Sequence, residues 1–166
     1  MSRAFVKEND LEHAGIDVPE RPISAEKNYV TPNGLVELEE KISILEEERT
    51  KLSLTNDSMH KQKKLQLERD LRYFISRLES AILVTPQEQD KNKVLFSALV
   101  NVENELGEIL NFQIVGEDEA NVKINKIAYN SPLAKALIGN ALDDEVVWMK
   151  PSGDETLTIV NIQYKL

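Results

Sequence analysis

Two runs of apolar residues at helical spacing dominate the first half of the chain. The first repeats in steps of three and four from Leu35 to Leu52, with Arg49 in one position, and the second repeats from Leu67 to Ala81. This spacing is typical of a coiled-coil seam. Residues 55–58 between them favour turns and helix caps. Because neither helix can bury its apolar stripe alone, the pattern predicts an antiparallel helical hairpin.

Cap-forming residues and prolines mark the ends of these helices. Thr31 and Pro32 suit the N-cap and the first helical position, so the first helix is expected from there to about residue 54. The second is expected from a cap at Asp57 or Ser58 to about residue 84, where a Thr-Pro pair stops it. Residues 1–28 contain no persistent period and are interrupted by glycine and prolines, so we expect an irregular leader.

After a polar linker at residues 87–92, the pattern changes to short strands with alternating apolar positions. Ser131 and Pro132 repeat the cap-plus-proline start, and Gly139 provides a stop, so a short helix is expected between them. The result is an α+β protein in which one short helix packs on an antiparallel sheet. Its expected parts are a leader at 1–28, the helical hairpin at 29–85 and the sheet domain at 93–166. The five expected strands are 94–102, 109–115, 122–129, 145–150 and 156–164.

Composition narrows the chemistry. The chain of 166 residues has no cysteine and two histidines, so neither a disulfide nor a Cys- or His-based metal site is expected. No apolar run approaches the length of a membrane span, and no signal-peptide core is visible, so we expect a cytoplasmic protein with no cofactor.

The charge is unevenly distributed. The net charge of −9 argues against free nucleic acid or an anionic membrane as the main partner. Residues 35–52 hold six acids and three bases, whereas residues 58–84 hold three acids and six bases, so the two helices complement each other.

Few residues suggest catalysis. Glu117, Asp118 and Glu119 are consecutive and are interpreted as a solvated acidic loop, and Trp148 is expected in the core. Asp57 is the one acid between Glu48 and Glu68. It either only caps the second helix or presents a carboxylate to a metal ion in another protein's active site.

Several stretches together resemble the GreA/GreB family of bacterial transcription elongation factors. Residues 29–35 (Tyr-Val-Thr-Pro-Asn-Gly-Leu) are similar to the family's opening into its first coiled-coil arm. Glu47-Glu48-Arg49 and Arg72-Tyr73 are similar to landmarks on the two arms. The most specific likeness is residues 114–120 followed by residues 127–139. The resemblance covers residues 29–164 and leaves the leader outside.

The resemblance implies an FKBP-like C-terminal domain and binding at the secondary channel of RNA polymerase. The family's polymerase-contacting loop corresponds here to Asn130, Ser131 and Pro132. Nucleic acid would be contacted only through the polymerase complex, and we expect a monomer without membrane contact.

The tip of the hairpin departs from the family's pattern. Cleavage-promoting members carry an Asp-x-x-Glu-type pair there, whereas residues 54–59 contain only Asp57. The hairpin also looks shorter by about one heptad per arm, on the order of 10 Å of reach. The resemblance therefore implies polymerase binding, and the tip argues against stimulated transcript cleavage.

Other functions stay open from the sequence. A hairpin that merely occupies the channel would act as an inhibitor or as a competitor of other channel-binding factors. The implied FKBP-like fold allows a prolyl isomerase or chaperone, which would require an aromatic-lined pocket. A coiled-coil adaptor without a polymerase link is the remaining alternative.

Overall fold

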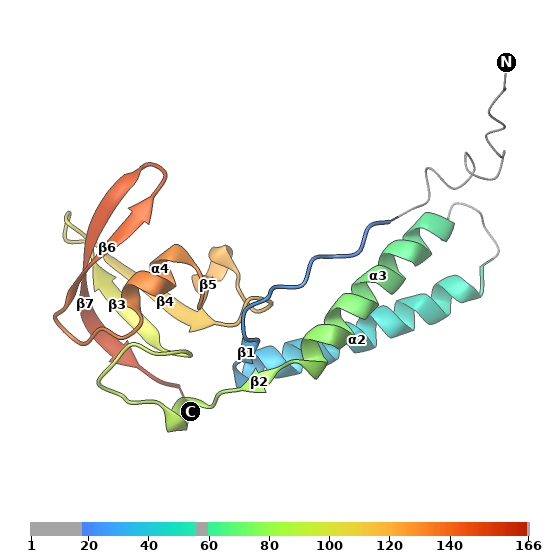
Figure 1. The fold of residues 1–166 in the computed structure, drawn as a ribbon, viewed down its shortest axis with the longest axis horizontal. Helices are drawn as coiled ribbons and strands as arrows, with labels where there is room; N and C mark the ends of the chain where they lie inside the picture. Colours follow the sequence, from blue (N-terminus) through green and yellow to red (C-terminus); the bar gives the residue numbers. More distant parts are fainter. Residues whose placement is uncertain (1–17, 56–59, 166) are drawn as a thin grey trace, which may run out of the picture. The chain divides into compact units, whose positions relative to one another are not determined.

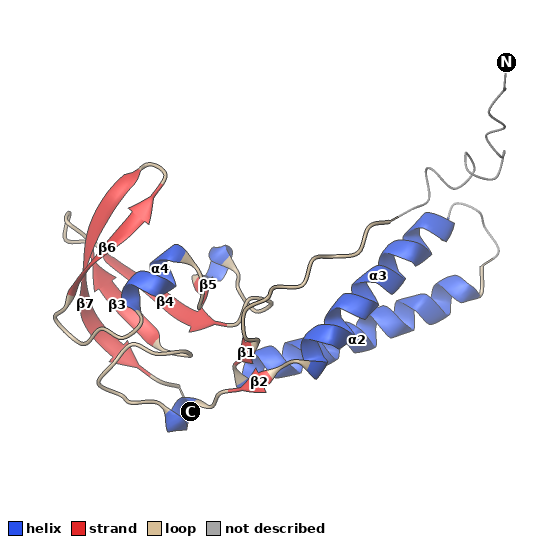
Figure 2. Cartoon of the chain, viewed as in Figure 1, coloured by secondary structure: helices blue, strands red, loops and turns tan. Residues whose placement is uncertain are grey.

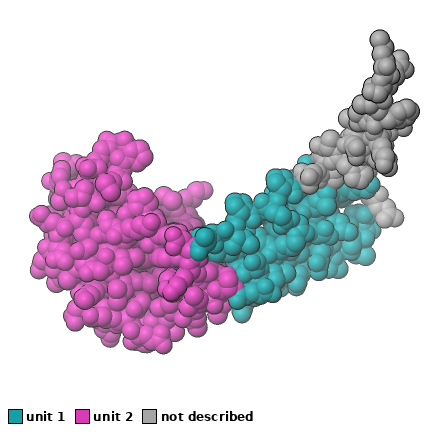
Figure 3. All heavy atoms as spheres, in the orientation of Figure 1, with its two compact units in different colours: residues 1–25, 39–79 teal, residues 26–38, 80–166 magenta. Residues whose placement is uncertain are grey.

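The computed structural model describes residues 18–55 and 60–165 (Figure 1). These residues divide into two compact units, coloured separately in Figure 3. The described part of the helical unit comprises residues 18–25, 39–55 and 60–79. The sheet unit comprises residues 26–38 and 80–165.

Two long helices form most of the helical unit. They are α2 (Pro32–Ser53), whose first residues belong to the sheet unit, and α3 (His60–Glu79). They pack through Leu45, Leu67 and Leu71, with Ile42, Leu52 and Phe74 partly buried against them. These residues belong to the two apolar runs of the sequence, so the predicted stripes do face each other. The start of α2 is also as predicted, because the Thr31 hydroxyl accepts a hydrogen bond from the Gly34 amide at 2.9 Å.

The second helix ends earlier than predicted. It stops at Glu79 rather than near residue 84. Ile82 and Leu83 instead form β2 (Ile82–Leu83), which pairs in parallel with β1 (Tyr29–Val30). The amide of Ile82 donates to the carbonyl of Asn28 at 2.8 Å and that of Val84 to the carbonyl of Val30 at 3.0 Å. These inter-strand bonds use amides that a longer helix would need. Helices and strands are distinguished in Figure 2.

The sheet unit contains a five-stranded sheet in the order β5-β4-β3-β7-β6. Its core comprises apolar residues from the strands and from α4 (Pro132–Leu137), which contributes Leu133, Ala134 and Leu137. One-turn 3-10 helices lie at Pro86–Glu88 (η1) and Val122–Ile124 (η2). The strands are β3 (Leu99–Glu103), β4 (Ile109–Val115), β5 (Lys126–Ala128), β6 (Glu145–Lys150) and β7 (Gly153–Gln163).

The predicted antiparallel sheet is wrong in one respect: the sheet is mixed. β4 pairs with β5 in parallel, while the other neighbours are antiparallel. The chain from residue 116 to residue 125 turns back along β4, so that β5 begins beside Gln113 and runs in the same direction as β4. Within it, η2 is capped by Asn121 and ended by Asn125, which has a left-handed backbone conformation. The predicted strand 122–129 is therefore only three residues long.

The first predicted strand is also shortened. It begins at Leu99 rather than at residue 94, because Ser97 has a positive φ of 72° and interrupts the extended backbone. Val94, Phe96 and Ala98 are nevertheless buried in the same core. The alternation of the sequence therefore predicts which side chains are buried better than it predicts where the strand begins.

Candidate partner-binding surface

The three residues predicted to contact a partner lie where β5 leads into α4, with Asn130 and Ser131 in the loop and Pro132 as the first residue of the helix. Ser131 caps α4, since its hydroxyl accepts a hydrogen bond from the Ala134 amide at 3.3 Å, and Pro132 occupies the first turn. The Asn130 side-chain amide donates to the Glu117 carboxylate at 2.7 Å. Pro132 is exposed, and Asn130 and Ser131 are half-buried. The local structure thus fixes the loop while leaving its surface accessible.

Beside this loop lies a shallow groove of about 400 Å³ between α4 and β6. Its lining combines one loop residue, three residues of α4 and two of β6: Asn130, Pro132, Lys135, Ala136, Val147 and Met149. Asn130 and Pro132 therefore form one end of a larger surface. The Lys135 side chain adds a cation to its edge.

The apolar character of the groove comes from the outward face of β6. Val147 is 52% exposed and Met149 is 71% exposed. Their neighbours point inward: Val146 is buried, and Trp148 packs edge-to-face on Phe112 with ring centroids 6.2 Å apart. Trp148 is half-buried at the boundary of the core in which it was predicted. β6 is also the last strand of the sheet, and an exposed apolar edge strand is a liability unless something covers it.

The acidic loop at residues 117–119 does not match the prediction of a solvated loop. Glu119 is only 6% exposed. Its carboxylate accepts hydrogen bonds from the Thr31 hydroxyl, the one to Oε2 at 2.9 Å, while that hydroxyl caps α2. A buried carboxylate here lies beside the positive end of the helix dipole.

Glycines allow this close packing. A Cβ at Gly34 would lie 3.1 Å from Oε1 of Glu119, and one at Gly116 would collide with the Tyr29 carbonyl. Glu119 is therefore a structural residue of the sheet unit.

The proposed metal chemistry of Asp57 lies outside the described residues, which omit positions 56–59. Within residues 18–55 and 60–165, no group of three or more His, Cys, Asp or Glu side chains could hold a metal ion. The same described segments contain no helix long and apolar enough to cross a lipid bilayer.

Comparisons with known proteins bear on both units. Residues 88–164 match the family model described as "Transcription elongation factor, GreA/GreB, C-term". Transcription elongation factor GreB of Haemophilus influenzae is 35% identical to the chain over 156 residues, an alignment that covers 85% of the chain and 99% of that protein. The chain belongs to the GreA/GreB family.

Two other family members are also similar to it. Transcription elongation factor GreA of Zymomonas mobilis is 35% identical over 126 residues, covering 74% of the chain and 80% of that protein. The solved structure of a prokaryotic transcription elongation factor GreA/GreB from Nitrosomonas europaea is 24% identical, with a TM-score of 0.42, and the match covers 83% of the chain and 100% of that structure.

Sequence reasoning missed part of this surface. The sequence pattern identifies Val147 and Met149 only as residues of a strand. The outward positions of a strand at a sheet edge usually carry polar side chains, so their apolar type was the available signal. Assigning β6 to the edge requires the strand order, which the sequence pattern does not contain.

Proposed function

We propose that this protein is a Gre-like transcription elongation factor that binds RNA polymerase at its secondary channel and modulates elongation. The observation that carries the proposal is the 35% identity to a protein named transcription elongation factor GreB, because that likeness spans 85% of the chain. The protein would act as a monomer in the cytoplasm, and any RNA cleavage would be performed by the polymerase.

We infer in addition that α2 and α3 form an antiparallel coiled-coil hairpin, within residues 29–85, that enters the channel. Residues 93–166, which make up most of the sheet unit, would form an FKBP-like domain that binds the rim. The buried leucines of α2 and α3 support the first inference. The accessible loop at Asn130, Ser131 and Pro132 supports the second.

The groove between α4 and β6 supplies a chemical basis for binding at the rim. Val147 and Met149 offer apolar area to a partner, and their burial would be worth about 25 cal/mol per Å². Asn130 and Lys135, at the margin of this area, would orient the partner through hydrogen bonds or an ion pair. A polymerase surface with apolar side chains flanked by acidic groups fits this groove.

A second candidate function is occupation of the channel without stimulation of cleavage. Asp57 is the single acid between Glu48 and Glu68, and Lys61, Lys63 and Lys64 follow it closely. One carboxylate is a weak ligand for a divalent ion, and nearby lysines repel a cation. The protein would then compete with other factors for the channel.

A cleavage assay on backtracked elongation complexes separates the two modes of action. For the channel-occupying mode, we expect the protein to bind the complex and to leave the cleavage rate unchanged. Faster cleavage that is lost in Asp57→Ala would instead assign the metal-holding role to Asp57. Failure to bind the complex at all would remove the polymerase function.

An isomerase function has no support from the described aromatic residues. Tyr29, Phe96 and Tyr129 pack against one another, with ring centroids 5.4–6.0 Å apart. None of these rings lines the groove between α4 and β6, whose lining contains no aromatic residue. A peptide isomerisation assay should therefore show no activity.

A further inference from the structure

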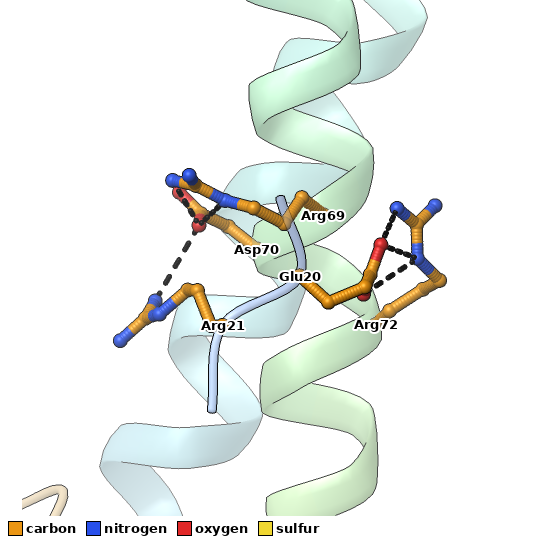
Figure 4. Close-up of polar contacts among 5 residues, drawn as sticks. All are labelled: Glu20, Arg21, Arg69, Asp70 and Arg72. Carbon is orange, nitrogen blue, oxygen red and sulfur yellow. Dashed lines mark hydrogen bonds and ion pairs between the residues drawn. The ribbon is translucent and has the colours of Figure 1, made fainter. Parts of the chain in front are cut away.

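Residues 18–25, here called the strap, contact α3 through two consecutive side chains (Figure 4). The Glu20 carboxylate accepts hydrogen bonds from the Arg72 guanidinium, those from Nε being 3.2 Å long. Arg21 lies over the Tyr73 ring, with its Cζ 3.8 Å from the ring centroid, and one of its nitrogens is 3.5 Å from an Asp70 oxygen.

The two side chains hold α3 from opposite sides. Figure 4 shows Glu20 directed toward Arg72 on one flank of α3, and Arg21 directed toward Asp70 on the other. Alternating side-chain directions are the property of an extended backbone. The strap therefore straddles α3 through two contacts on opposite flanks of the helix.

Prolines on each side of this pair reduce the cost of ordering it. Pro19 and Pro22 flank Glu20 and Arg21 in the sequence. Each proline fixes its own φ and restricts the preceding residue to extended conformations. The free strap is thus already close to the conformation that it adopts on α3, so less conformational entropy is lost on docking.

The contact site is connected to the packing between the two helices. Tyr73 packs edge-to-face on Phe74 with centroids 5.1 Å apart, and Phe74 packs on the buried leucines. The Phe74 ring is approached by Arg21 of the strap at 5.0 Å and by Lys41 of α2 at 5.9 Å. Three segments of the helical unit therefore meet at one aromatic ring.

The apolar cluster shared by α2 and α3 is small. Among the described residues of α2 and α3, three leucines are buried in the shared cluster, while Ile44 is 53% exposed and Ile75 is 39% exposed. A helix pair with so small a core gains little from burial alone.

We propose that the strap is a third structural element of the helical unit, a brace that closes the seam at Phe74 and that high ionic strength opens. The ion pairs that hold it are partly exposed, with Glu20 and Arg72 side chains 63% and 58% accessible. Charge pairs in that setting are screened by salt. The brace is closed at low salt and released when salt weakens both contacts.

Docking is tested on the full chain with one spin label. The chain has no cysteine, so Ile23→Cys, at an exposed strap position, gives a single attachment site. At low salt we expect the label to broaden the amide NMR signals of residues 69–74. Glu20→Arg should abolish the broadening, and the swap Glu20→Arg with Arg72→Glu should restore it.

The matched control is Glu47→Arg, the same charge change at an exposed acid on α2 that pairs with Lys51. This variant should leave the broadening intact. Broadening that persists in Glu20→Arg, or that salt of about 1 M does not reduce, would overturn the proposal. Failure of the swap to restore it would do the same.

Whether the docked strap also stabilises the helix pair is tested on α2, the helix on the other side of the seam from its contacts with α3. Hydrogen exchange of α2 amides around Leu45 should quicken roughly two- to fivefold in Arg21→Ala, the loss expected for one exposed cation–π contact. Arg21→Lys keeps the charge but lacks the planar group, so its exchange rate should lie between those of the native chain and Arg21→Ala. If Arg21→Ala loses the broadening while the exchange of α2 amides stays unchanged, the strap docks without bracing the helices, and the brace is overturned.

Discussion

The two units are stabilised in different ways. The sheet unit buries twelve apolar residues in one cluster, among them Val100, Ile114 and Leu157 at 0% exposure. The helical unit buries three leucines in its cluster and places ion pairs and cation–π contacts around them. Apolar burial involves no charge that titrates or is screened, whereas exposed charge pairs respond to both pH and salt. Changes of solution conditions should therefore act first on the helical unit.

The largest effect is expected from a cavity in the sheet core. Leu157→Ala should lower the free energy of unfolding of the sheet unit by about 2–5 kcal/mol, because a fully buried side chain is removed. Trp148, the single tryptophan, lies in this unit, so urea unfolding followed by its fluorescence reports on the unit. Leu106→Ala, at a site 82% exposed, is the control and should change nothing measurable.

A matched cavity in the helical unit should cost less. Leu71→Ala should destabilise the α2–α3 pair by about 2 kcal/mol, the lower end of the range, because the small cluster opens to water. Far-ultraviolet circular dichroism should show an earlier loss of helix, while the Trp148 transition stays in place. An equal shift of both signals would contradict the separate stabilisation of the two units.

The third-largest effect is expected from the hydrogen bonds of Thr31 at the start of α2. Thr31→Ala removes the helix cap and leaves the buried Glu119 carboxylate without that donor. We expect a loss of about 1–2 kcal/mol in urea unfolding. Thr31→Ser keeps the hydroxyl and should restore most of the stability. If serine proves as damaging as alanine, the hydrogen bonds are not the cause.

The smallest effect concerns pH. The hydrogen bonds from Arg72 lower the pKa of the Glu20 carboxyl below its ordinary value of 4.5. A lowered folded-state pKa means that this contribution is complete above pH 4.5 and is lost as pH falls through the folded-state value.

The spin-label broadening of α3 should therefore decrease in acid. Asp70 also faces Arg21, so Glu20→Gln serves as the comparison that isolates the contribution of Glu20. That variant should show weaker broadening at neutral pH and a smaller change in acid. An identical acid profile in both proteins would exclude Glu20 as the responsive group.

Much of the fold could be predicted from local patterns. The caps at Thr31 and Ser131 and the seam leucines follow from short-range spacing, and the structure confirms them. The parallel pairing of β5 and the early end of α3 could not be predicted, because both depend on contacts with distant residues. The burial of Glu119 depends on Thr31, 88 positions away, and no local signal reveals it.

The candidate surface, like the fold, can be predicted from the sequence only in part. Asn130, Ser131 and Pro132 were found through a resemblance, but whether they bind a partner stays a prediction. Val147 and Met149 join them only after the chain has folded, since β6 reaches α4 from a separate part of the sequence. The contacts of Glu20 and Arg21 likewise could not be predicted, because a short irregular segment has no regular spacing of apolar residues.

Equilibrium binding to core RNA polymerase tests the central claim most directly. We expect the native chain to bind, and Met149→Glu to weaken binding roughly tenfold or more, because a charge would be buried in an apolar contact. Leu106→Glu, the same kind of change at an exposed site in a different cleft, should bind like the native chain. Absence of binding, or equal binding by both variants, would contradict a polymerase-binding surface at the groove between α4 and β6.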